Sequence, residues 1–86
     1  MKSLIRNYID LLNLDKLKNF ALKNDINLTD TELNYLLNLV KENYEDILIN
    51  DEKYLKEIKS NINNSEYQKI EDLYKYYKKR YKGYLF

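Results

Sequence analysis

The residues best suited to chemistry in this chain are tyrosines near its C-terminus. The spacing of six apolar positions there alternates between three and four residues, which is the spacing of a heptad seam on one face of a helix. These positions are Tyr67, Ile70, Tyr74, Tyr77, Tyr81 and Tyr84. Tyrosine combines a large apolar ring with a hydroxyl at its tip, so the seam has two interpretations. It packs against the chain's own helices, which is the simpler interpretation, or it binds a protein partner or a second copy of this chain. In the second case we expect the contacts from Tyr77, Tyr81 and Tyr84, with Lys78 and Arg80 at the rim.

The same region is locally basic. From Ser65 onward six lysine and arginine residues stand against three acidic ones, a balance of +3, whereas the whole chain carries only +1. Cations interleaved with aromatic rings are typical of proteins that bind single-stranded nucleic acid, because rings stack on bases and cations hold phosphates. The negative end of a helix dipole also favours cations. Nucleic-acid binding by the basic end of the last helix is therefore the alternative function, and a less favoured one.

Catalytic constellations are not evident in the sequence. It has no cysteine and no histidine, so it offers no thiol nucleophile, imidazole base or zinc cluster. The three serines have no histidine to activate them. Gly83 is the only glycine, which excludes the glycine-rich loops that cradle phosphates. We expect a protein that is not an enzyme and takes no cofactor or small-molecule ligand.

Acidic residues gather in two places, at 42–46 and at 51–52. Carboxylates at helix ends explain both groups without a metal. The stretch that starts at Asp25 resembles the beginning of a calcium-binding loop. That pattern requires glycine at its sixth position and glutamate at its twelfth, where this chain has Asp30 and Leu36. We therefore expect no metal site.

The elements that must position these residues are helices. The chain has 86 residues, of which 44% are apolar and 34% charged, with one glycine and no proline. This composition disfavours β-sandwiches, which need frequent turn residues. Apolar spacing predicts a single all-α domain over 1–86, a compact bundle of four to five short helices with a longer C-terminal helix. The expected helices are about 3–12, 13–23, 30–43, 51–61 and 65–82. The third and fourth form the centre, and the last lies across them.

Several helix boundaries follow from capping residues. Thr29 with Glu32, and Ser65 with Gln68, fit the capping-box pattern, and Asn50 is placed to cap the fourth helix. The start of the second helix stays open between Asn13 and Asp15. Two apolar stretches, 26–28 and 47–49, are expected as connectors that form buried loops, or less simply a short extended pair. The core-facing stripe of the third helix is predicted to contain Leu33, Leu36, Leu37, Val40 and Tyr44.

The location expected from the sequence is cytoplasmic. The longest aliphatic run is Ile47–Ile49, far short of the roughly 20 residues that cross a bilayer. Polar residues interrupt the N-terminal segment at Arg6, Asn7 and Asp10, before any signal-peptide core. We expect no membrane partner.

Four stretches of the chain resemble a family of short proteins from low-GC Gram-positive bacteria, the YqfT-like proteins. They lie at 17–24, 26–32 and 47–52 and in the aromatic-rich last helix, within about Leu17 to Tyr77. The resemblance implies a helical protein of similar length and carries over no activity. The chain departs from the family after the third helix, where a basic segment is usual and this sequence has Lys41-Glu42-Asn43-Tyr44-Glu45-Asp46.

Overall fold

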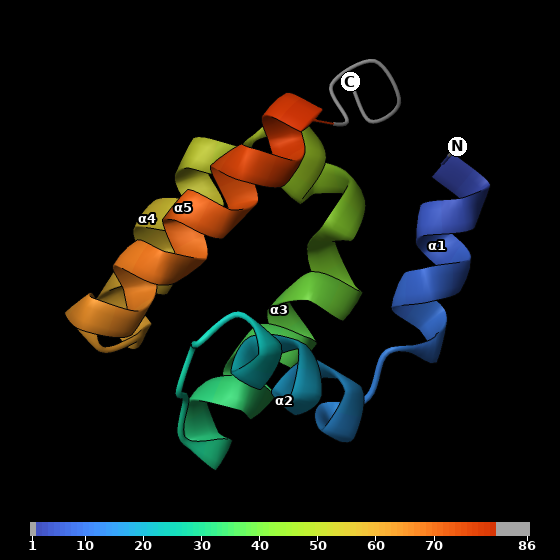
Figure 1. Ribbon diagram of the computed structural model, residues 1–86. Coiled ribbons are helices and arrows are strands. Elements are labelled where there is room, and N and C mark those ends of the chain that lie inside the picture. The colour runs from blue at the N-terminus through green and yellow to red at the C-terminus, as the bar shows by residue number, and fades with distance from the viewer. Residues whose placement is uncertain (1, 81–86) are drawn as a thin grey trace.

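Five α-helices make up the part of the chain that the structure describes (Figure 1). The computed structural model describes the backbone of residues 2–80 and the side chains of residues 6–80. No strand occurs in that part, so the predicted all-α bundle is confirmed. The helices are α1 (Lys2–Leu11), α2 (Leu14–Lys23), α3 (Asp30–Ile49), α4 (Asp51–Asn61) and α5 (Asn64–Arg80). The expected end of the last helix near Lys82 lies outside the described residues.

The first two helices are separate, which settles the boundary that the sequence left open. Asn13 has extended backbone angles, and its side chain accepts a hydrogen bond of 2.9 Å from the Lys16 amide. This satisfies an amide at the start of α2 that has no partner within the helix. The side chain of Leu12, directly before this cap, is buried. The buried leucine and the Asn13 cap together turn the chain from α1 into α2.

The capping box predicted for the third helix is formed. The Thr29 hydroxyl accepts a hydrogen bond of 3.1 Å from the Glu32 amide, and one Glu32 carboxylate oxygen accepts a bond of 2.9 Å from the Thr29 amide. The second oxygen of Glu32 accepts a bond of 3.0 Å from the amide of Asn63, in the turn between α4 and α5. The cap therefore also ties the start of α3 to a distant turn.

α3 is longer than predicted, and the expected connector at 47–49 is wrong. The helix continues from Asn43 to Ile49, and the Asn50 amide still donates to the carbonyl of Asp46 at 2.7 Å. No glycine or proline stands in this stretch to end the helix, and the Asn43 amide group donates back to the Leu39 carbonyl within it. The helical turn places Ile47 against the core and leaves Ile49 77% exposed. The expected buried loop and extended pair are therefore both absent here.

Two of the predicted caps are not formed. The Asn50 side chain donates to the Asp46 carboxylate at 2.7 Å and makes no capping bond to α4. The last helix begins at Asn64, one residue earlier than expected. The side-chain oxygen of Asn63 accepts hydrogen bonds from the Ser65 amide at 3.0 Å and from the Ser65 hydroxyl at 2.8 Å. Asn63 therefore takes the capping role expected of Ser65, whereas the Asn50 side chain is directed back toward Asp46 of α3.

The core lies between α3, α4 and α5. Its buried side chains are Leu36, Leu39, Tyr54, Ile58, Ile62 and Tyr67. The predicted stripe of α3 is partly wrong, because Leu39 is buried while Leu37, Val40 and Tyr44 are only half-buried. The reason is that α3 contacts α4 on one side and α1 and α2 on another, which needs a wider apolar arc than one stripe. In Figure 1, α5 lies beside α4 as one pair, while α1 lies apart from this pair.

Candidate functional site

The tyrosine seam of α5 is mostly turned inward where the structure describes it. Tyr67 is only 5% exposed, and Ile70 and Tyr74 are half-buried. This agrees with the packing interpretation for the first half of the seam. Tyr77 is half-buried as well, while Tyr81 and Tyr84 lie outside the described residues. Tyr76 is off the seam and is 54% exposed.

Asp51, at the start of α4, receives two hydrogen bonds from α5. One of its carboxylate oxygens accepts from the Tyr74 hydroxyl at 3.0 Å and from the Lys78 ammonium at 2.6 Å. Burial alone would raise the pKa of Asp51, but these two bonds outweigh it and hold the pKa below its usual value. Burial and the carboxylate together raise the pKa of Tyr74 far above its usual value. Lys78, predicted as a rim residue, therefore also joins α5 to α4.

Three aromatic rings meet where α2 and α5 end, and we call this group the aromatic end. It consists of Phe20, Tyr76 and Tyr77. The ring centroids of Phe20 and Tyr77 lie 6.4 Å apart, and those of Tyr76 and Tyr77 lie 5.4 Å apart in an edge-on contact. The Arg80 guanidinium donates a hydrogen bond of 2.9 Å to the Tyr76 hydroxyl. The structure thus brings predicted residues Tyr77 and Arg80 together with Phe20 of α2.

Much of the positive charge on α5 is engaged by neighbouring acids. Lys69 lies 3.4 Å from the Glu66 carboxylate and donates to the Asp25 carbonyl at 2.8 Å. Lys75 pairs with Glu71 at 3.1 Å, and Lys78 pairs with Asp51. Within the described chain the last turn of α5 is the most basic segment of this helix, with Lys78, Lys79 and Arg80.

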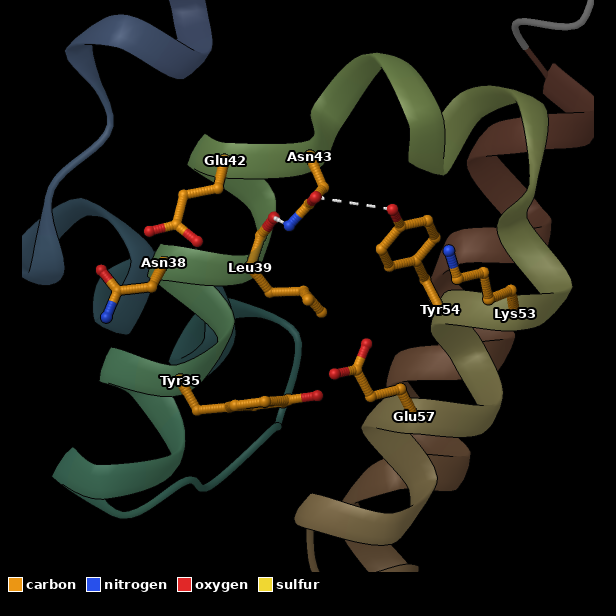
Figure 2. Close-up of a pocket in the computed structure, with 8 residues that line it drawn as sticks. All are labelled: Tyr35, Asn38, Leu39, Glu42, Asn43, Lys53, Tyr54 and Glu57. Carbon is orange, nitrogen blue, oxygen red and sulfur yellow. Dashed lines mark hydrogen bonds between the residues drawn. The ribbon is translucent and has the colours of Figure 1, made fainter.

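A polar groove of about 490 Å³ separates α3 from α4 (Figure 2). Figure 2 shows Tyr35 reaching toward it from α3, and Tyr54 and Glu57 from α4. The Tyr54 hydroxyl donates to the Asp46 carboxylate, and this bond, with burial, raises the pKa of Tyr54 to about 12. A phenol with so high a pKa is a poor proton donor or nucleophile near neutral pH. The groove has polar walls but no activated group that we can identify.

The acidic clusters have structural partners. The same Asp46 carboxylate accepts from Tyr54 and Asn50, and these two bonds lower its pKa. Nowhere in residues 2–80 do three or more acidic side chains gather as a metal ion would require. Over the same residues, the structure contains no helix with the length and apolar character needed to cross a bilayer.

Comparison with known proteins finds no relative. No family model matches the sequence, and neither a curated protein nor a solved structure matches it significantly. The resemblance to the YqfT-like proteins therefore stays a prediction.

Proposed function

We propose that this chain is a protein–protein interaction module without catalytic activity, and that it binds through the aromatic end and the last turn of α5. The main support is an exposed ring held in place by its neighbours. Tyr76 is 54% exposed, contacts Tyr77 edge-on and accepts a hydrogen bond from Arg80. A ring that is already ordered loses little conformational freedom when it is covered, which favours binding.

The composition of this surface is also that of an interface. Tyrosine, phenylalanine and arginine are enriched at the centres of protein interfaces, and tyrosine and arginine dominate their hot spots. The aromatic end supplies two of these residue types, tyrosine and phenylalanine, at the meeting point of two helices. Lys78 and Arg80 stand beside it as the proposed rim, and the predicted contacts of Tyr81 and Tyr84 would extend it.

The simplest partner is a second copy of this chain. Two copies related by a two-fold axis would place the same aromatic end on both sides of the contact. Arg80 of one copy could then stack on a tyrosine ring of the other, which offsets part of the repulsion between the two basic turns.

Sedimentation equilibrium at about 10–100 µM tests this proposal with two tyrosine variants. Tyr76→Ser removes the exposed ring of the aromatic end, and we expect it to weaken dimerisation at least tenfold. Tyr8→Ser, at a tyrosine of α1 that is 59% exposed, is the matched control and should leave dimerisation unchanged. A monomer at every concentration would exclude self-association. Affinity capture with wild-type and Tyr76→Ser protein would then test for a different protein partner, and equal capture by both would contradict the proposed surface.

Nucleic-acid binding is the second candidate, supported by two exposed features of the same helix end. Lys79 and Arg80 follow Tyr77 within one helical turn, so cations stand near rings that could stack on bases. The pairing of Lys69, Lys75 and Lys78 with carboxylates weakens this candidate. Titration of single-stranded RNA and duplex DNA at increasing salt tests it, because phosphate contacts require a steep loss of affinity with salt. An absence of binding at low salt would exclude it.

A further inference from the structure

An apolar cavity of about 290 Å³ lies between α2, α3, α4 and α5. Among the described residues that line it, Asp51 is the only charged one. The deep part of the lining is buried and includes Ala21, Ile26 and Leu36. The opposite part reaches the surface at Phe20, which is 36% exposed, and at the half-buried Tyr77. The cavity therefore opens beside the aromatic end.

The size of this cavity is unusual for a chain of 86 residues. Protein interiors contain few voids larger than a water molecule, since side chains pack as densely as organic crystals. The cavity has room for about ten groups of roughly 30 Å³, the volume of one water molecule in the liquid. An α-helix about 10–12 Å across does not fit such a space. One unbranched chain of about ten carbon atoms does.

The polarity of the lining indicates the chemistry of the occupant. Every buried polar side-chain atom within the described residues has a hydrogen-bond partner. The interior therefore has no unpaired polar atom that a polar ligand would satisfy. The Asp51 carboxylate is already bonded to Tyr74 and Lys78. A nucleotide or sugar would lose its hydrogen bonds to water in these walls without replacement, whereas a hydrocarbon chain would lose none.

The charges near the opening indicate the head group. The last turn of α5 follows Tyr77 with Lys78, Lys79 and Arg80, and Lys78 pairs with Asp51 of the lining. On α2, Lys23 stands three residues after Phe20, which places both on the same side of the helix. Basic residues therefore stand on both helices that flank the opening, and they favour an anionic head group over a cationic one.

We propose that the cavity binds a medium-chain fatty acid, with its alkyl chain inside and its carboxylate at the basic opening. The alkyl chain would cover the half-buried apolar side chains of the lining, such as Leu73 of α5 and Val40 of α3. The ligand site shares Phe20 and Tyr77 with the aromatic end, but Tyr76 is not among the described residues that line the cavity. Tyr76→Ser therefore tests the interaction surface and leaves the cavity lining unchanged, so the oligomer assay and the ligand assay can fail separately.

Isothermal titration with decanoate tests the site in the full-length protein. We expect saturable binding of one decanoate per chain at or below about 1 mM. From hexanoate to decanoate each added methylene should strengthen binding about fourfold, the effect of burying one CH₂ group. Decyltrimethylammonium, with the same chain and a cationic head, should bind at least tenfold more weakly. No saturable binding of decanoate, or equal binding of the cation, would overturn the proposal.

A pair of tryptophan variants locates the site. Leu73→Trp places a larger side chain in the cavity, and we expect it to weaken decanoate binding at least tenfold. Leu22→Trp is the matched control, because Leu22 is 53% exposed and does not line the cavity. It should change the affinity less than twofold. Equal effects of the two variants would place decanoate elsewhere and overturn the proposal.

Two further measurements cover the case in which Leu73→Trp does not fold. Val40→Phe fills the same cavity from α3 and should also weaken binding. Nuclear Overhauser contacts between decanoate methylenes and the methyl groups of Ile26 and Ile58 are expected in the wild type. Contacts only to residues outside the lining would contradict the proposed site.

Discussion

Asp51 shows what a single residue contributes beyond its local role. Its place in the first turn of α4 suits a carboxylate, because the positive end of the helix dipole lies there. The same oxygen also accepts hydrogen bonds from Tyr74 and Lys78, which follow it by 23 and 27 residues. One carboxylate thus stabilises the start of α4 and holds α5 against it.

We predict that Asp51 makes the protein sensitive to acid. Its pKa is lowered in the folded state, so its contribution to stability is complete above the ordinary aspartate pKa of about 4 and is lost as the pH falls through the lower, folded value. Asp46 and Glu32, whose pKa values are also lowered, act with the same sign. Urea unfolding at about pH 5 and pH 3 should show a smaller loss of stability in Asp51→Asn than in the wild type.

The control for this experiment is Asp72→Asn, at an exposed carboxylate on the same helix as Lys78. It should lose stability between the two pH values as much as the wild type does. If Asp51→Asn and the wild type lose stability equally, the bonds to Tyr74 and Lys78 are not the source of the acid sensitivity.

At the scale of the elements, glutamates at two helix starts tie distant parts of the chain together. Glu32 completes the capping box of α3 and accepts from the amide of Asn63 before α5. Glu66, in the first turn of α5, accepts a bond of 3.0 Å from the amide of Asn27, in the connector between α2 and α3. The start of α3 thus stabilises the turn that leads into α5, and the start of α5 stabilises the connector that leads into α3.

We predict that Glu32→Ala destabilises the protein more than Thr29→Ala does. Thr29→Ala removes one half of the capping box and should cost about 1 kcal/mol. Glu32→Ala removes the other half and also leaves the Asn63 amide without its acceptor, which should bring the cost to about 2 kcal/mol. Urea unfolding followed by circular dichroism measures both. Equal losses would show that the bond to Asn63 contributes nothing to stability.

For the whole molecule, α3 determines how the helices pack. It contacts α4 on one side and α1 and α2 on another, and the radius of gyration is 12.3 Å. A folded chain of this length is expected near 12 Å, so the described helices are packed together despite the cavity between them. Leu36 contributes to this packing twice, since it belongs to the buried core and to the cavity lining.

We predict that Leu36→Ala strongly destabilises the protein. Truncation of a buried leucine costs about 2–5 kcal/mol, which is a large part of the roughly 4–8 kcal/mol expected for a chain of this size. Leu37 is only half-buried, so Leu37→Ala should cost clearly less, and Leu11→Ala, at a side chain 67% exposed, should cost little. Thermal unfolding by circular dichroism tests this order. A Leu36→Ala melting temperature within a few degrees of the wild type would contradict it.

Local sequence was sufficient for the helical class and for some of the caps whose partners lie within one turn. Thr29 with Glu32 and Asn13 with Lys16 are formed, whereas the expected caps at Asn50 and Ser65 are not, although their partners are equally close in sequence. Apolar spacing also placed Leu33 and Leu36 of α3 correctly in the core, since one helix face determines their direction.

Tertiary structure decided the features that depend on a second helix. Whether Tyr77 faces its own core or a partner depends on where Phe20 of α2 lies, and Asp51 acquires its role only when α5 packs beside α4. The cavity has no signal in the sequence, because its walls come from four helices whose separate apolar faces look ordinary. Hydrogen bonds along a helix link residues close in sequence, whereas packing contacts and the spaces between helices join residues far apart, which no local pattern specifies.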